Sequence, residues 1–157
     1  MIKPIRSATA DTLDGVKAIM RFLIAEDDPI GARILELLLK PYGQSVKALD
    51  GEEALTQFKG AHQAQEPFRL LFLDIVMPKK LGMEVLSDVR AYEREHKISS
   101  ENQVKVIMLT GQADLNNINK AQVLGISNYL IKPFEEDQLL RGLQHLGIIE
   151  DPNDSWR

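Results

Sequence analysis

Leu70-Leu71-Phe72-Leu73-Asp74 is an apolar run that ends in an acidic residue. Its four consecutive apolar residues predict a short strand buried on both faces, because such runs are typical of the central strands of a parallel sheet. Asp74 follows the run directly. The stretch therefore predicts a buried central strand with a carboxylate at its carboxyl end.

Strand and helix patterns alternate on both sides of this stretch. Further strands are predicted at residues 22–25, 46–48, 104–109 and 128–131, the second of them as an edge strand. Helices are predicted at residues 29–40, from residue 51 onward, and at residues 82–96, 114–124 and 135–146. Strict alternation of five strands with five helices predicts a parallel sheet with helices on both faces. Right-handed crossovers make a doubly wound α/β fold the most economical arrangement.

Capping residues mark where several of these helices begin or end. Asp28 is predicted to cap the first helix, with Pro29 at its first position. Asp50 and Glu53 resemble a capping box at the start of the second helix, and Gly125 is expected just past the end of the fourth. The inward face of the first helix is predicted from its aliphatic side chains: Ile30, Ile34, Leu37 and Leu38.

The chain has 157 residues, a length that suits one compact domain with a full core. Residues 20–147 are interpreted as that domain. Residues 1–19 have only weak hydrophobic periodicity and are interpreted as a flexible N-terminal extension with a short helical turn near residues 13–19. Residues 148–157 are expected to form a polar, frayed C-terminal tail.

The overall composition excludes several classes of protein. Hydrophobic residues make up 44% and charged residues 27% of the chain, as in globular proteins. The formal net charge of -4 gives no sign of a nucleic-acid-binding surface. Cysteine is absent, which excludes disulfides and suits a cytoplasmic location. No apolar run is long enough to predict a membrane span.

Polar residues with complementary chemistry follow four of the five predicted strands. They are Glu26, Asp27, Asp74, Thr110 and Lys132. Ligands of such folds bind beyond the carboxyl ends of the strands, so these residues are expected to share one crevice. Three converging carboxylates repel one another unless a cation or a proton compensates them. Oxygen ligands select a hard ion, so the group predicts a Mg²⁺ site, to which Lys132 adds a positive charge.

A carboxylate in such a site can attack phosphorus and form an aspartyl phosphate. A metal ion, a lysine and a hydroxyl group can then stabilise the charge that spreads over the phosphoryl oxygens. Asp74 suits the nucleophile because it ends the most buried strand, at the centre of the group.

Four segments together resemble the signature segments of bacterial response-regulator receiver domains. They are LIAEDDP (residues 23–29), LDIVMP (73–78), LTG (109–111) and YLIKPF (129–134). The resemblance covers about residues 20–147. It implies a flavodoxin-like (βα)5 fold whose five-stranded parallel sheet has the order 2-1-3-4-5. It also implies a cis peptide bond between Lys132 and Pro133.

The resemblance further implies a role for each residue of the group. Asp74 would be the phosphorylation site, and Thr110 and Lys132 would contact the phosphoryl oxygens. Mg²⁺ would be held by Glu26 (through water), Asp27, Asp74 and Val76 (backbone carbonyl).

Signalling would follow from a change at Thr110. In receiver domains, phosphorylation draws this residue inward and an aromatic side chain, here Tyr129, follows it. The surface of the fourth helix, fifth strand and fifth helix would then bind an unknown downstream protein. The donor would be a histidine kinase or a phosphotransfer protein, and homodimerisation is left open. Val76 and Gln112, neither of them acidic, would tune dephosphorylation, and we expect a phosphoryl lifetime of minutes or longer.

The sequence departs from the receiver pattern at three places. Leu81 stands where Asp or Asn is frequent before Gly82, and Ile126 replaces a common Ala after Gly125. Residues 93–103 lengthen the third helix and its exit loop, which predicts a surface protrusion.

Other interpretations stay open. The domain could be one piece of a larger regulator, with the acidic residues 150–154 beginning a linker. It could instead be a Mg²⁺-dependent phosphohydrolase, although such enzymes usually carry a second acid where Val76 stands. Asp27 and Asp28 could be mere helix caps, and the three histidines are expected on the surface because none has ligand spacing. Walker and dinucleotide-binding motifs are absent.

Overall fold

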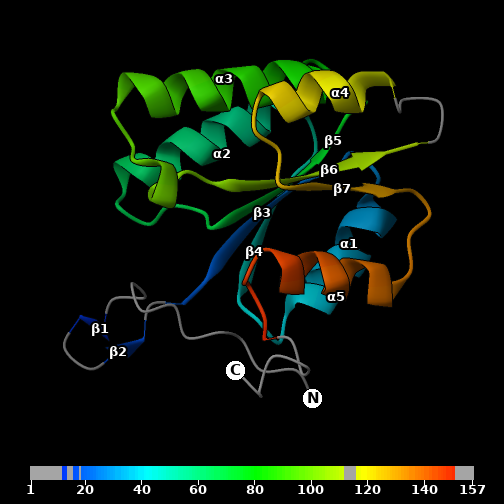
Figure 1. Ribbon diagram of the computed structural model, residues 1–157, viewed down its shortest axis with the longest axis horizontal. Helices are drawn as coiled ribbons and strands as arrows, with labels where there is room; N and C mark the ends of the chain where they lie inside the picture. Colours follow the sequence, from blue (N-terminus) through cyan, green and yellow to red (C-terminus); the bar gives the residue numbers. More distant parts are fainter. Residues whose placement is uncertain (1–11, 14–15, 18, 112–115, 151–157) are drawn as a thin grey trace.

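The computed structural model describes residues 12–13, 16–17, 19–111 and 116–150. Five parallel strands of this part form one sheet: β3 (Arg21–Ala25), β4 (Gln44–Ala48), β5 (Leu70–Asp74), β6 (Lys105–Thr110) and β7 (Asn128–Ile131). They lie in the order β4-β3-β5-β6-β7, which is 2-1-3-4-5 counted along the chain. The predicted doubly wound fold, with β4 at an edge and β5 at the centre, is confirmed (Figure 1).

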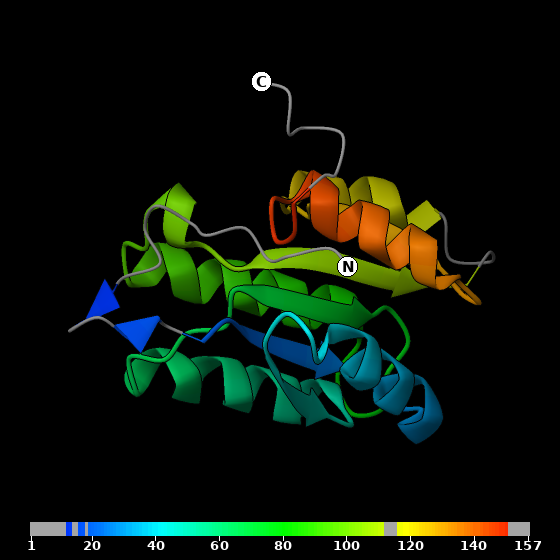
Figure 2. The same cartoon turned by 90° about the horizontal axis from the view of Figure 1, so that it is seen from below.

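Helices cover both faces of the sheet. Their bounds are α1 (Pro29–Leu39), α2 (Gly51–Gln63), α3 (Gly82–Glu95), α4 (Asn116–Val123) and α5 (Glu136–His145), with a short 3₁₀ helix, η1 (Ser100–Asn102). Figures 1 and 2 show α2, α3 and α4 on one face and α1 and α5 on the other. These bounds agree with the predicted ones within a few residues. The predicted first residues of α4, 114 and 115, lie outside the described part of the chain.

The sheet divides the core into two clusters because successive side chains of a strand point to opposite faces. On β5, Leu71 and Leu73 pack under α2 and α3, whereas Leu70 and Phe72 pack against α1 and α5. Every residue of β5 is buried, as the apolar run predicts. Burying a side chain of this size stabilises the fold by about 1.5–3 kcal/mol, so β5 anchors both layers.

The predicted inward face of α1 is wrong for three of its four residues, and only Leu38 packs against the core. Ile30 is 72% exposed, and Ile34 and Leu37 are each 50% exposed. The side chains that pack on the sheet are instead Ala32, Leu35 and Leu39. Apolar residues lie almost all the way round this helix, so helical spacing alone fits more than one inward face.

The predicted caps are confirmed in part. Asp28 accepts hydrogen bonds from the backbone N–H groups of Ile30 (3.1 Å) and Gly31 (3.3 Å), and Pro29 opens α1. At α2, Asp50 accepts from the backbone of Glu53 (2.8 Å). The Glu53 carboxylate, however, accepts from the backbone of Leu49 (3.0 Å). The reciprocal bond of a capping box therefore reaches one residue further back than predicted.

Both ends of the domain differ from the prediction. Thr12–Leu13 (β1) pairs antiparallel with Val16–Lys17 (β2), so the helical turn predicted near residues 13–19 is wrong. β-Branched residues in both segments favour extended backbone. At the other end, Ile148 and Ile149 are fully buried, so the core extends two residues beyond its predicted end. Most of the predicted extension and tail, residues 1–11 and 151–157, lies outside the described residues.

The histidines do not all lie on the surface as predicted. His96 and His145 are exposed. The His62 ring instead packs edge-on against Phe58, with centroids 4.8 Å apart, and lies 5.6 Å from the Tyr92 ring. Within the described chain, none of the helices is both long and apolar enough to cross a membrane.

Candidate functional site

The predicted site residues lie where the strands end. Asp74 is the last residue of β5 and Thr110 the last of β6. Glu26 and Asp27 follow β3, and Lys132 follows β7. Because the strands are parallel and in register, these ends meet at one edge of the sheet.

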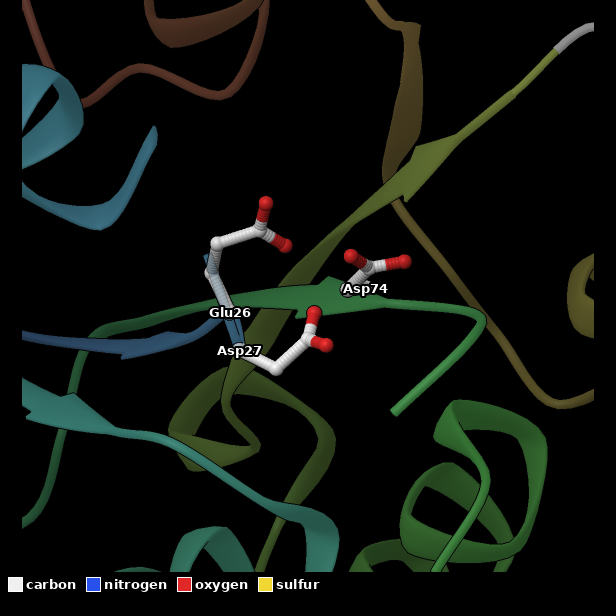
Figure 3. Close-up of side chains that lie close together, drawn as sticks. All are labelled: Glu26, Asp27 and Asp74. Atoms are coloured by element: carbon white, nitrogen blue, oxygen red, sulfur yellow. The ribbon is translucent and has the colours of Figure 1, made fainter. Parts of the chain in front are cut away.

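Three carboxylates converge at this edge. One oxygen each from Glu26, Asp27 and Asp74 lies within 4.8 Å of the others. Figure 3 shows Glu26 and Asp27 reaching from the end of β3 toward the space beside Asp74. Asp74 and Glu26 are only 4% and 2% exposed, whereas Asp27 is exposed to solvent. The predicted acidic cluster is therefore present, with one side open.

Lys132 bridges two of these carboxylates. Its Nζ lies 2.7 Å from Asp74 Oδ2 and 3.0 Å from Glu26 Oε1. Burial alone would lower the pKa of Lys132, but its contacts with Asp74 and Glu26 outweigh burial and raise that pKa above its usual value. Lys132 therefore stays charged and compensates part of the negative charge in the cluster.

One positive charge does not balance three carboxylates. Burial, together with the hydrogen bond and the negative charge of Asp74, raises the pKa of Glu26 to about 8, although Lys132 opposes the shift. Without a cation, Glu26 is therefore mostly protonated at pH 7. This agrees with the sequence-based expectation that a carboxylate in this group must take up a proton unless a cation is bound.

The donor set fits a hard divalent cation. Carboxylate oxygens that lie close together, with one side of the cluster exposed, suit Mg²⁺ and the waters it retains. Once Glu26 has lost its proton, the buried members supply negative charge that Lys132 leaves uncompensated. The cluster Glu26, Asp27 and Asp74 is thus able to hold the ion predicted from the sequence.

The loop after β5 holds Asp74 and Val76 in place. The backbone N–H of Val76 donates to Asp74 Oδ1 at 3.0 Å. The N–H of Gly82 donates to Ile75 O at 2.9 Å, and any side chain at position 82 would collide with the backbone carbonyl of Asp74. Glycine is therefore required where α3 begins. Leu81, which departs from the receiver pattern, caps α3 without a side-chain hydrogen bond.

Thr110 and Tyr129 lie on neighbouring strands but are differently exposed. Thr110 is fully buried, and its hydroxyl donates to Gly111 O at 2.9 Å. Tyr129 is 37% exposed on β7. The backbone N–H of Lys132 donates to Thr110 O at 2.7 Å, which ties the end of β6 to the site. Gln112 lies outside the described residues.

Sequence reasoning placed Lys132 in the crevice but missed that it bridges Asp74 and Glu26. A basic residue following a strand opposite buried acids was the available signal. The cis peptide bond between Lys132 and Pro133, implied by the receiver resemblance, is present.

Comparisons with known proteins agree with this fold. The sequence pattern of the response regulator receiver domain family matches residues 22–144. The chain belongs to this family, whose domains serve in two-component signalling.

Similar sequences occur within longer proteins. The peroxide stress-activated histidine kinase mak2 of Schizosaccharomyces pombe is 32% identical over 129 residues, which are 82% of this chain and 5% of that protein. The signal transduction histidine-protein kinase BarA of Escherichia coli K12 is 32% identical over 80% of this chain and 13% of its own length. The probable transcriptional regulator ycf27 of Porphyridium aerugineum is 35% identical over 76% of this chain and 44% of its own length. The chain thus spans less than half the length of these curated relatives.

Solved structures share the fold. A response regulator receiver domain protein from Clostridium thermocellum has a TM-score of 0.66 and 25% identity over 83% of this chain and 94% of that chain. A CheY-like receiver domain protein from Methanospirillum hungatei JF-1 has a TM-score of 0.65 and 27% identity over 82% of this chain and 94% of that chain. The predicted flavodoxin-like receiver fold is confirmed.

Proposed function

We propose that this receiver domain is a phosphorylation switch in which Asp74 accepts a phosphoryl group from a phosphohistidine. The observation that carries the proposal is the position of Lys132 Nζ, within 3.0 Å of both Asp74 and Glu26. A lysine held by the nucleophile of a phosphoryl transfer is placed to contact the incoming phosphoryl oxygens.

The proposed transfer forms one bond and breaks one. A carboxylate oxygen of Asp74 bonds to phosphorus while the bond from phosphorus to the donor imidazole nitrogen breaks, and the imidazole leaves with the electron pair of that bond. Lys132 and the Val76 N–H hold different oxygens of Asp74 and so orient the carboxylate. Burial of Asp74 excludes most of the water that would otherwise compete for these contacts.

Mg²⁺ would be held by Glu26 (through water), Asp27, Asp74 and the Val76 carbonyl. When bound, the ion would neutralise charge on the phosphoryl oxygens. The convergence of carboxylate oxygens within 4.8 Å supports this assignment.

Readout would pass through Thr110 and Tyr129. The Thr110 hydroxyl donates to its neighbour's carbonyl, and this bond would have to be exchanged for one to a phosphoryl oxygen. Tyr129 would follow and change the surface of α4, β7 and α5 for a downstream protein. With beryllofluoride as a phosphoryl mimic, Thr110→Ala should abolish the movement of Tyr129 seen in the wild type by NMR. A normal movement in Thr110→Ala would contradict this coupling.

The donor would be a histidine kinase or a phosphotransfer protein. Similarity to segments of two histidine kinases supports a place in a phosphorelay, and the greater length of those relatives supports a receiver that works with further domains. A phosphohydrolase is less well supported, because Val76 stands where such enzymes carry a second acid.

Intact mass spectrometry tests the proposal. With acetyl phosphate and Mg²⁺, the wild type should gain the mass of one phosphoryl group and Asp74→Asn should gain none. Asp28→Asn is the matched control, since Asp28 caps α1, and it should gain the same mass as the wild type. Equal labelling of wild type and Asp74→Asn would contradict the assignment.

A further inference from the structure

Arg90 and Glu93, one turn apart on α3, form a buried ion pair away from the acidic cluster. Arg90 is 9% exposed and Glu93 fully buried, with 2.6 Å between Arg90 Nη1 and Glu93 Oε1. The sequence placed Glu93 at the start of an exposed protrusion. Residues 94–97 and 99–102 are exposed, so the buried pair lies directly before an exposed stretch.

The remaining donors of Arg90 bind the end of another helix. Nε donates to Leu124 O at 2.9 Å, and Nη2 donates to Gly125 O at 2.7 Å. These carbonyls directly follow Val123, the last residue of α4. The last carbonyls of a helix lack partners within the helix and carry partial negative charge. Arg90 therefore caps the C-terminal end of α4 from the neighbouring helix.

The same pair binds the start of β6. Arg90 Nη1 donates to Val104 O at 3.0 Å, and Glu93 Oε2 accepts from Val104 N at 2.8 Å. The pair thus joins α3, the beginning of β6 and the C-terminal end of α4. β6 runs from this junction to Thr110 at the opposite end of the sheet, and Figure 1 shows α3 and α4 side by side on the same face.

Side-chain packing holds the described part of α4 only lightly. Its buried side chains are Ile118 and Ala121, and Val123 is 86% exposed. A hollow of about 280 Å³, lined in part by Arg90 and Leu124, lies beside its C-terminal end. Leu124 and Ile126, which follow the helix, are partly buried against the core, and the charged hydrogen bonds of Arg90 hold the same segment by its backbone carbonyls.

We propose that Arg90 is a positioning residue that pins the C-terminal end of α4, so that phosphorylation turns α4 about this end. The proposal rests on the proposed function, because the phosphoryl group at Asp74 drives the movement. The chain runs from Thr110 toward Asn116, the first residue of α4. A displacement at Thr110 therefore acts on the N-terminal end while Arg90 holds the other end.

Distances between spin labels test whether α4 turns about its C-terminal end, which we call the pivot. Because the chain has no cysteine, the exposed residues Ser87, Asn116 and Val123 can be replaced by Cys in pairs. Ser87 on α3 is the reference. With beryllofluoride and Mg²⁺, the Ser87–Asn116 distance should shift by about 1–2 Å or more, while the Ser87–Val123 distance keeps its mean and width. Equal shifts of both distances, or a shift of Val123 alone, would overturn the pivot.

Two variants test whether Arg90 holds the C-terminal end of α4, an attachment that we call the pin. Arg90→Met/Glu93→Gln removes the bonds to α4 without leaving a buried unpaired carboxylate. Glu93→Gln alone is the matched control, because it leaves the bonds of Arg90 to Leu124 and Gly125 in place. The double variant should broaden the Ser87–Val123 distribution even without beryllofluoride, and this distance should then shift on activation. The control should behave as the wild type, and thermal unfolding verifies that both variants are folded.

The outcomes separate this inference from the proposed function. In one outcome, the Ser87–Val123 distance distribution of the folded double variant is as narrow as that of the wild type. This result would contradict the role of Arg90 in holding α4, whether or not Asp74 is phosphorylated. A wild type that gains phosphoryl mass but shows no shift of Asn116 contradicts the pivot alone. A wild type that gains no mass contradicts the proposed function and with it the pivot, while the width measurement still tests the pin.

Discussion

Glu26 is the residue whose charge depends most on what the site holds. Its pKa, raised to about 8 by burial and by Asp74, means that at pH 7 a proton must leave when Mg²⁺ binds. We expect Mg²⁺ affinity to rise about tenfold per pH unit below pH 8 and to level off above it. Titration calorimetry at pH 6.5, 7.5 and 8.5, in buffers of different ionisation enthalpy, measures the affinity and the proton released.

The matched variant is Glu26→Gln, which has no proton to release. It should bind Mg²⁺ more weakly at pH 8.5 and with little dependence on pH. A wild type whose affinity is flat from pH 6.5 to 8.5, with no buffer-dependent enthalpy, would contradict the assigned role of Glu26.

Val76 is expected to control how long the aspartyl phosphate lasts. Its backbone binds the carboxylate of Asp74, and its apolar side chain neither activates nor orients an attacking water. The phosphorylated wild type should therefore persist for minutes or longer after Mg²⁺ is removed by a chelator. Val76→Ala, which opens the approach for water, should decay faster. Loss of the wild-type phosphoryl group within seconds would refute the prediction.

Individual site residues were predictable because functional residues in this class of fold lie at the carboxyl ends of the strands. Asp74 was found from the apolar run that precedes it. The contact between Lys132 and Glu26 was not, because the two residues are 106 positions apart and meet only through the order of the strands. The junction at Arg90 was also missed, because its carbonyl partners leave no signal in the sequence.

Among the helices, α1 presents an unusual outer face. Ile30, Ile34 and Leu37 recur at helical spacing and are at least half exposed, and α1 begins two residues after Asp27. A phosphohistidine can reach Asp74 only if the donor protein covers the surroundings of the site. We therefore expect the donor to pack a helical surface on this stripe.

Ile34→Asp should slow phosphotransfer from a phosphorylated histidine-phosphotransfer protein by about tenfold, as expected for a buried interface residue. Labelling by acetyl phosphate should not change, because that donor needs no docking surface. Val123→Asp, an exposed apolar position on α4, is the control and should leave both rates unchanged. Equal loss with both donors would indicate damage to the site instead.

For α1, the bounds could be predicted from the sequence but the inward face could not. The bounds of α1 followed from Asp28 and Pro29, since capping acts over a few neighbouring residues. Its inward face did not follow, because apolar residues on several sides of the helix fit helical spacing and the buried ones are Ala32, Leu35 and Leu39. Which apolar stripe packs inward depends on the space that the finished sheet leaves.

Across the whole molecule, His62 makes stability depend on pH. Burial lowers its pKa, with Glu93 opposing and His96 reinforcing the shift. The folded state thus favours the neutral ring, while the unfolded state takes up a proton near pH 6.5. His62 therefore contributes its full stability above pH 6.5 and loses part of it as the pH falls below 6.5.

His62→Phe keeps an aromatic ring beside Phe58 and Tyr92 but cannot be protonated. Between pH 7 and 5.5, the free energy of unfolding of the wild type should fall further than that of His62→Phe, measured with urea. Glu26 titrates in both proteins, so the difference between the two curves isolates His62. Parallel curves would show that His62 does not contribute to the pH dependence.

The overall fold was predicted correctly, whereas several of its details were not. Alternating strands and helices restrict the chain to a doubly wound sheet, and the receiver resemblance supplied the strand order that periodicity leaves open. The burial of Ile148 and Ile149 was missed because two apolar residues before a polar tail carry no periodic signal.

Asp74, and no other carboxylate of the cluster, is expected to receive the phosphoryl group. Borohydride reduces an aspartyl phosphate to homoserine, which peptide mass spectrometry can locate in the chain. After acetyl phosphate and Mg²⁺, we predict homoserine at position 74, and none when a chelator replaces Mg²⁺. Homoserine at position 27 or 28, or an unmodified position 74 in protein that has gained phosphoryl mass, would contradict phosphorylation of Asp74.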